Sequence, residues 1–360
     1  MTPSLRNEVG VPHTRILKVN PQAPESAAIQ KAAEFIRAGK LVAFPTETVY
    51  GLGVNALDGE AVGAIFRAKG RPASDPLIVH IADWSQLEEV AIRIPPLALE
   101  LARHFWPGPL TLVLQKSAAI PFEVTAGGEK VAVRWPAHPV AEALIRVSDV
   151  PIAAPSANLF GHTSPTTAEH VYADLHGRIH LILDGGPTFI GLESTVLDVT
   201  TTPPLILRPG GLPLETLRSF VPDLALRLHY RPETQQAESP GQMLRHYAPH
   251  ALLLLFEGEG ASLIFSMQKV AEEHQRQGQR VGILTVDEER EMLTLPGIEV
   301  LSLGSLHDLT TIGRNLFAAL RLMEEKGVDV ILARTFPRQE LGLTIWDRLY
   351  RAAQGRVIRA

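Results

Sequence analysis

The spacing of apolar residues changes along the chain and predicts two structural units of different architecture. In the first 220 residues, apolar runs of strand length, such as 41–44 and 131–135, are interrupted by stretches with helical spacing, such as 26–37. The predicted strands and helices alternate without strict βαβ order. This irregularity favours a twisted, mixed α/β sheet over a doubly wound parallel sheet.

The pattern becomes regular beyond residue 250. Apolar runs of strand length, separated mostly by helical stretches, lie at 251–256, 281–286, 298–303 and 328–333. This spacing is typical of a small Rossmann-like domain of parallel strands covered by helices. Between the two units, residues 231–241 are polar and rich in turn-forming residues. We therefore predict an α/β domain over residues 14–220, a linker over 221–250 and a small Rossmann-like domain over 251–360.

The composition excludes several kinds of chemistry. The chain of 360 residues is 45% hydrophobic, so each unit can bury a core without a disulfide or a metal. The absence of cysteine excludes disulfides, cysteine-bound metals and thiol catalysis. The sequence has neither an apolar stretch of ~20 residues nor an N-terminal apolar core, so a cytoplasmic protein without membrane contact is expected. A net charge of −5 predicts that any contact with nucleic acid is weak or indirect.

Two cations separated by a glycine form the strongest chemical signal. Lys69 and Arg71 flank Gly70 at the end of a predicted helix, and Pro72 stiffens the segment that follows. The pair could neutralise a polyphosphate, because arginine offers a fixed fork of donors and lysine a compact charge. The alternative is a solvated helix C-terminus, where cations are favoured in any case.

Polar residues beside other apolar runs are compatible with a ligand site or with ordinary structure. Arg134 lies in an apolar strand and, if buried, needs an anionic partner, either a substrate carboxylate or an internal acid. His80 lies near the end of the apolar strand predicted at 77–81. It is either a functional histidine or an ordinary histidine of the core. Residues 51–56 match G-x-G-x-x-A but begin a predicted strand instead of opening a helix, so no dinucleotide site is expected. His246 and His250 lie four residues apart, as do His176 and His180. Pro249 argues against a helix that would present the first pair to a metal, and no protein-bound transition metal is expected.

Seven segments together resemble the YrdC-type L-threonylcarbamoyladenylate synthases in their two-domain form. They are FPTETVYGLG at 44–53, KGRP at 69–72 with the following PLIVHI, VAVRWPAHP at 131–139, APSAN at 154–158 with the following GHTSP, ESTV at 193–196, LRPG at 207–210 and SPGQMLRHYAP at 239–249. They cover the first unit almost throughout, and the last segment is typical of the longer family members.

The resemblance implies a YrdC-like fold and a particular reaction. L-Threonine, bicarbonate and ATP would give L-threonylcarbamoyl-AMP and pyrophosphate, with Mg²⁺ carried on the ATP phosphates and no organic cofactor. A partner complex would then transfer the threonylcarbamoyl group to the adenosine 3′ of the anticodon in tRNAs that read ANN codons. Two other classes remain open: an RNA-binding module with a basic pocket, and a carbamoyl-adenylate enzyme of another pathway.

The resemblance also implies two groups of binding residues. Those on the threonine side would be Thr48, His80, Arg134, Ser194 and the backbone of Ala154, with Arg134 paired to the threonine carboxylate. Those on the ATP side would be Lys69, Arg71, Asp75, Lys130, Ser156, Asn158, Ser164, Arg208 and Tyr247. Lys69 and Arg71 are the predicted catalytic residues, because they would neutralise the phosphates during transfer. The linker, including Tyr247, would fold back over the nucleotide as a lid.

Overall fold

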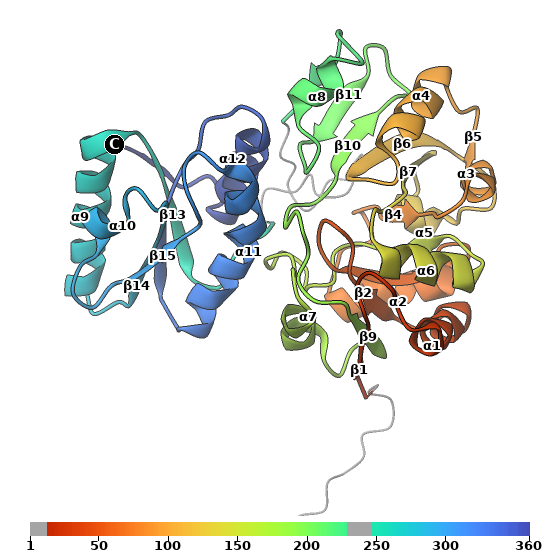
Figure 1. The fold of residues 1–360 in the computed structure, drawn as a ribbon, viewed down its shortest axis with the longest axis horizontal. Coiled ribbons are helices and arrows are strands. Elements are labelled where there is room, and N and C mark those ends of the chain that lie inside the picture. Colours follow the sequence, from red (N-terminus) through yellow and green to blue (C-terminus); the bar gives the residue numbers. More distant parts are fainter. Residues whose placement is uncertain (1–12, 229–245) are drawn as a thin grey trace, which may run out of the picture.

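The computed structural model describes residues 13–228 and 246–360, which form two α/β domains side by side (Figure 1). We define the first domain by strands β1 to β12 and the second by β13 to β17. The predicted fold class is confirmed, because a mixed sheet in the first domain is followed by a separate sheet of parallel strands in the second. Most of the predicted linker, residues 229–245, lies outside the described residues.

The sheet order of the first domain brings several strand ends to one edge. The order is β1-β9-β2-β3-β8-β4-β7-β6-β10-β11-β12, with β5 paired to β6. β4 runs parallel to β7 and β6 runs parallel to β10, whereas the pairs β6/β7 and β10/β11 are antiparallel. The last residues of β4, β7 and β11 therefore lie at the same edge as the residue that precedes β10.

The predicted apolar runs 41–44 and 131–135 correspond to β2 and β7, and the helical stretch 26–37 corresponds to α1. The strands are β1 (Arg15–Lys18), β2 (Val42–Phe44), β3 (Gly51–Asn55), β4 (Ile78–His80), β5 (Ala91–Ile92), β6 (Leu110–Lys116), β7 (Lys130–Arg134), β8 (Ile152–Ala153), β9 (Leu181–Asp184), β10 (Thr195–Asp198), β11 (Leu205–Arg208) and β12 (Ala225–Leu226). The helices are α1 (Ser26–Arg37), α2 (Gly59–Lys69), α3 (Trp84–Val90), α4 (Pro96–Phe105), α5 (Phe122–Thr125), α6 (Pro139–Ser148), α7 (Ala168–Leu175) and α8 (Leu214–Arg218).

The helix α2 shows how local sequence positions a site residue. The Asp58 side chain accepts hydrogen bonds from the backbone N–H groups of Glu60 and Ala61 and so caps the first turn. Gly70 ends the helix in the left-handed conformation, at φ 65°, which glycine adopts without strain. The chain consequently leaves the helix between Lys69 and Arg71.

The second domain is a five-stranded parallel sheet with helices on both faces. Its strand order is β15-β14-β16-β13-β17. The helices α9 and α10 lie away from the first domain, and α11 and α12 lie toward it (Figure 1). The elements are β13 (Leu252–Glu257), α9 (Gly260–Arg276), β14 (Val281–Thr285), α10 (Arg290–Leu293), β15 (Glu299–Ser302), α11 (Leu309–Glu325), β16 (Val330–Arg334), α12 (Leu341–Ala352) and β17 (Val357–Arg359).

One apolar core crosses the boundary between the domains. Ile312 of α11 and Ile345 of α12 pack in the same buried cluster as Val49 and Leu192 of the first domain. The cluster also includes Tyr247 of the connecting segment, by which we mean residues 246–251 before β13. Because burial of apolar surface is the main favourable term in folding, this shared core fixes the two domains against each other.

Buried polar contacts with α12 reinforce the boundary. The Nε of Arg348 donates to Glu193 Oε2 at 2.7 Å, and its second terminal nitrogen donates to the carbonyl of Pro209 at 2.9 Å. The hydroxyl of Thr344 donates to the carbonyl of Gly210 at 2.9 Å. A Cβ added at Gly210 would lie 2.2 Å from the carbonyl carbon of Ser194, so only glycine fits there.

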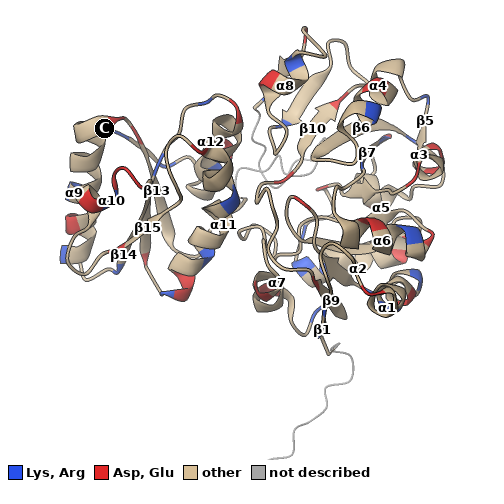
Figure 2. Cartoon of the chain, in the orientation of Figure 1, with Lys and Arg blue, Asp and Glu red and all other residues tan. Residues whose placement is uncertain are grey.

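Charged residues of both signs are distributed over both domains. Figure 2 shows basic and acidic residues together on helices such as α6 and α9. Within the described ranges, none of the helices is long and apolar enough to span a membrane.

Candidate active site

A cavity lies at the sheet edge where the strand ends of the first domain meet. It holds about 510 Å³ of empty space, counted together with the open solvent at its mouth. Its walls come from the loop after β2, from the edge of the first sheet and from the end of the connecting segment. The lining residues are Thr46, Thr48, Val49, Tyr50, Gly51, Arg71, Ile78, His80, Arg134, Ala154, Pro155, Ser156, Glu193, Ser194, Arg208, His246 and Tyr247.

All the residues predicted for the threonine side line this cavity. His80 and Arg134 are register partners at the ends of the parallel strands β4 and β7. The Thr48 hydroxyl lies 2.7 Å from that of Thr46, which holds the loop after β2. Ser194 and Ala154 complete this group of cavity residues.

Arg134 is buried and already has an anionic partner. Its terminal nitrogen lies 2.7 Å from Glu47 Oε1, and its Nε donates to the carbonyl of Gly108 at 3.2 Å. The sequence left two partners open for Arg134, a substrate carboxylate and an internal acid, and the structure contains the internal acid, Glu47. The guanidinium also faces the cavity, so it could bind a carboxylate in addition to Glu47.

The imidazole of His80 is held in its neutral form. Burial, and then the charge of Arg134, lower its pKa from the usual 6.5 to about 3. Within the described residues, the Nδ1 of His80 and the hydroxyl of Tyr247 have no hydrogen-bond partner, although both are buried. Unsatisfied buried groups cost about 1–3 kcal/mol each, and a bound polar ligand would remove that cost.

The low pKa of His80 predicts a specific acid sensitivity. Between pH 6.5 and about 3, the unfolded chain binds a proton at this residue and the folded protein does not. Stability is therefore lost as the pH falls through this window, by up to about 1.4 kcal/mol per pH unit from this one group. In denaturant titrations at pH 6.5, 5.5 and 4.5, the free energy of unfolding of His80→Asn should fall less steeply with decreasing pH than that of the wild type. Parallel declines would contradict this account.

Ser194 and Arg208 form a second hydrogen-bonded group in the cavity wall. Arg208 ends β11 and donates to the Ser194 carbonyl at 2.9 Å and to its hydroxyl at 3.2 Å. The Ser194 hydroxyl also lies 2.7 Å from that of Thr111 in β6. These bonds orient the serine from two strands and place a guanidinium directly beside it.

The two predicted catalytic cations occupy different positions relative to the cavity. Arg71 lines it and pairs with Asp75 at 2.9 Å, whereas Lys69 is buried behind the wall. The Lys69 amine donates to the carbonyl of Ser156 at 2.6 Å and to that of Asn158. Burial, and then the charge of Arg71, hold the pKa of Lys69 well below its usual value. The alternative of a solvated helix end does not apply, because both side chains are buried.

The other residues predicted for the ATP side are dispersed. Ser156, Arg208 and Tyr247 line the cavity, whereas Asp75, Asn158 and Ser164 are buried next to residues that do. The Ser164 hydroxyl donates to Glu193 Oε1 at 2.5 Å. Lys130 lies at the start of β7, at the opposite end of that strand from Arg134, and pairs with Asp198 at 2.8 Å. The structure does not bring Lys130 to the cavity.

The connecting segment closes one side of the cavity through Tyr247. This residue is fully buried, and the guanidinium groups of Arg348 and Arg351 lie 4.8 and 4.7 Å from its ring centroid. His246 packs against the same ring at 4.1 Å. The second domain therefore supports the residue that completes the pocket.

No role was assigned from the sequence to three charged residues that support this site. Glu47 and Glu193 lie inside the motifs at 44–53 and 193–196, beside predicted ligand residues, so their positions could have indicated a role. Arg348 carries no such signal, because it lies on an amphipathic helix 155 residues from its partner Glu193.

Comparisons with known proteins agree with this architecture over both domains. Residues 34–210 match the Sua5–YciO–YrdC family model, described as telomere recombination. Residues 212–354 match the model described as the C-terminal domain of threonylcarbamoyl-AMP synthase.

The similarity extends over nearly the full length of two relatives. The chain is 48% identical over 338 residues to the threonylcarbamoyl-AMP synthase of Pyrococcus abyssi, covering 93% of this chain and 96% of that protein. It is 48% identical over 332 residues to the threonylcarbamoyl-AMP synthase of Bacillus subtilis, covering 92% and 94%. The crystal structure of P. abyssi Sua5 complexed with L-threonine superposes with a TM-score of 0.91 at 47% identity, covering 96% of this chain and 99% of that one.

The fold and the cavity thus define a two-domain α/β enzyme with a cation-lined pocket. The chain belongs to the threonylcarbamoyl-AMP synthase family. The predicted family and enzyme class are confirmed by these matches.

Proposed function

We propose that this chain makes L-threonylcarbamoyl-AMP and pyrophosphate from L-threonine, bicarbonate or CO₂, and ATP. The observation that supports the substrates best is the convergence of Arg134, neutral His80, Arg71 and Arg208 on one cavity. A guanidinium beside small hydroxyls suits an amino acid, and further guanidiniums suit a polyphosphate. The similar P. abyssi protein was crystallised with L-threonine.

On the threonine side, the residues bind and orient an amino acid. The carboxylate of threonine would accept hydrogen bonds from Arg134, and its hydroxyl and amine would face Thr48, His80 and Ser194. A neutral imidazole can accept a hydrogen bond from the amine without repelling it. Threonine held in this way would present its nitrogen for carbamate formation with CO₂.

On the ATP side, the residues neutralise charge during phosphoryl chemistry. The carbamate oxygen would attack the α-phosphorus in line, forming a new P–O bond as the bond to pyrophosphate breaks. Arg71 and Arg208 would stabilise the developing negative charge, and a polyphosphate near Lys69 would favour the charged form of that buried amine. Positioning and charge neutralisation account for the catalysis, so no general base is assigned.

Mg²⁺ would enter as part of the nucleotide substrate. Glu193, which lines the cavity, is already paired with Arg348, and Glu47 is paired with the lining residue Arg134. Mg²⁺ keeps several waters and binds few protein carboxylates, so ligation by the ATP phosphates suits these surroundings. The product would supply a separate complex that modifies adenosine 3′ of the anticodon in tRNAs reading ANN codons.

The proposal is tested by pyrophosphate release from ATP and Mg²⁺ with threonine and bicarbonate each omitted in turn. Release should require both, and mass spectrometry should detect the threonylcarbamoyl adenylate. Release that does not depend on threonine would indicate a carbamoyl-adenylate enzyme of another pathway. No release, together with salt-dependent tRNA binding, would favour an RNA-binding module.

A further inference from the structure

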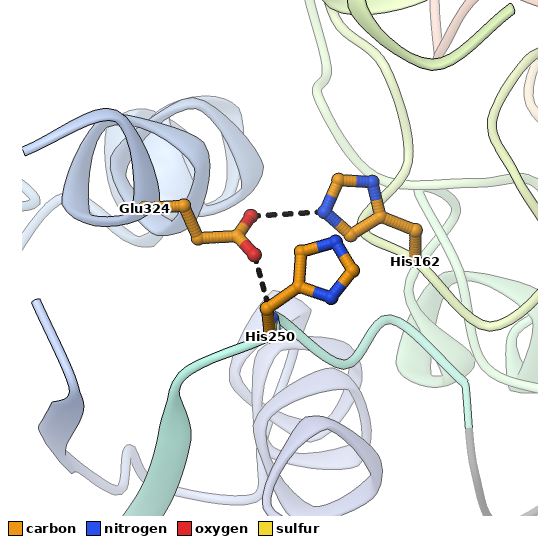
Figure 3. Close-up of side chains that lie close together, drawn as sticks. All are labelled: His162, His250 and Glu324. Atoms are coloured by element: carbon orange, nitrogen blue, oxygen red, sulfur yellow. Dashed lines mark hydrogen bonds and ion pairs between the residues drawn. The ribbon is translucent and has the colours of Figure 1, made fainter. Parts of the chain in front are cut away.

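A cluster of two histidines and a glutamate lies between the domains, outside the cavity described above. His162 comes from the loop after β8, His250 from the end of the connecting segment and Glu324 from the last turn of α11. Figure 3 shows the Glu324 carboxylate directed toward His162, with the His250 ring beside both. The candidate ligand atoms of the three residues all lie within 4.8 Å of one another.

One pair of donor atoms in the cluster already lies near the spacing of a coordination shell, and the third residue lies beside them. His162 Nε2 lies 2.9 Å from Glu324 Oε2, and the two imidazole rings stack with centroids 5.1 Å apart. Donor atoms at 2.0–2.1 Å from a tetrahedral ion are separated by about 3.3 Å. His250 is exposed, so its ring can turn to direct a nitrogen at the space between the other two.

Neighbouring residues hold His162 as a metal ligand is usually held. Its Nδ1 lies 2.9 Å from the Asp174 carboxylate, so Nε2 is left facing the cluster. Asp174 in turn accepts two hydrogen bonds from Arg321, each of 3.0 Å. A carboxylate on the far nitrogen fixes the tautomer and ring orientation of metal-binding histidines and increases their basicity.

We propose that His162, His250 and Glu324 bind one Zn²⁺ ion that fastens the second domain to the first. Two imidazole nitrogens and one carboxylate oxygen suit this ion, with water as a fourth ligand. The site adjoins the segment that closes the cavity, because Ala248 N–H donates to the Gly161 carbonyl at 2.8 Å and Phe160 packs on His246. A bound ion would therefore also stabilise the docked position of Tyr247.

A metal-free arrangement is the competing explanation. A doubly protonated His162 could bridge Asp174 and Glu324 without any ion. Burial lowers the pKa of His162, but its hydrogen bonds to the two carboxylates outweigh this effect and raise it. The two explanations differ in whether the full-length protein binds zinc with defined stoichiometry.

The experiment uses the tag-free full chain, dialysed against a chelator and then titrated with ZnCl₂ by calorimetry. We expect one site per chain, a higher melting temperature with Zn²⁺, and visible absorption bands of tetrahedral Co²⁺ when that ion replaces it. His250→Ala and Glu324→Gln should each weaken Zn²⁺ binding by about 100-fold or more. His176→Ala, which removes an exposed histidine outside the cluster, should bind as the wild type does.

His250→Ala is the decisive variant, because the exposed side chain contributes little to the core. Without added zinc, this variant should keep the circular dichroism spectrum and the unfolding midpoint of the wild type, which shows that the fold is intact. Failure of the wild type to bind Zn²⁺ stoichiometrically, or binding that both variants leave unchanged, would overturn the proposal. These outcomes are independent of whether the proposed synthase reaction is correct.

Discussion

Replacement of Arg134 by alanine is expected to raise the KM for L-threonine by about 10- to 150-fold. This range corresponds to the loss of a charge-assisted hydrogen bond worth about 1.5–3 kcal/mol. The arginine is buried at the cavity edge, where little water competes with a bound carboxylate. Pyrophosphate release at varied threonine concentrations measures the effect, and the KM for ATP should change far less.

Matched variants separate binding from folding in this experiment. Arg134→Ala leaves Glu47 buried without its partner, which is itself destabilising. The double variant Glu47→Gln/Arg134→Gln removes both charges and should recover stability but not threonine affinity. Arg146→Ala removes an exposed arginine close to Trp135 and should leave both KM values unchanged. An unaltered threonine KM in Arg134→Ala would refute the assignment.

Replacement of Arg348 by alanine should destabilise the chain by about 3–5 kcal/mol. The side chain is fully buried and pairs with Glu193 and with Asp347. Its removal leaves the buried Glu193 carboxylate without the guanidinium that donates to it, which costs more than the net contribution of the pair. Denaturant unfolding followed by circular dichroism and tryptophan fluorescence measures the loss.

An exposed ion pair provides the control for this prediction. Arg276 lies 3.9 Å from Glu272 on the surface of α9, and such pairs contribute about 0–1 kcal/mol. Arg276→Ala should therefore unfold near the wild-type midpoint. If Arg348→Ala unfolds there too, the buried network between the domains does not stabilise their contact.

Local structure was largely predictable because its causes are local. Residues 26–37 and 59–69 carry helical spacing with a glycine at or after the end, and both form helices within those bounds. The parallel sheet of the second domain followed from the regular alternation of apolar runs. The strand order of the first sheet could not be predicted, because β8 pairs with β3 and β4 through contacts distant in sequence.

The candidate site was predictable where ligand residues stand in short motifs. Thr48, His80, Arg134 and Ser194 were placed together from such segments, and the structure puts them in one cavity. The charged residues that support them were harder to predict from the sequence. An arginine on an amphipathic helix gives no local sign that it will meet a glutamate in another domain, because the pairing is decided by docking of whole helices.

The packing of segment 208–210 on both sides determines how a movement of α12 reaches the cavity. On one side its carbonyls accept hydrogen bonds from α12, and on the other its glycine backbone touches Ser194 without room for a methyl group. A segment packed on both sides cannot absorb a displacement of the helix. A displacement of α12 would therefore be passed directly to the wall of the pocket.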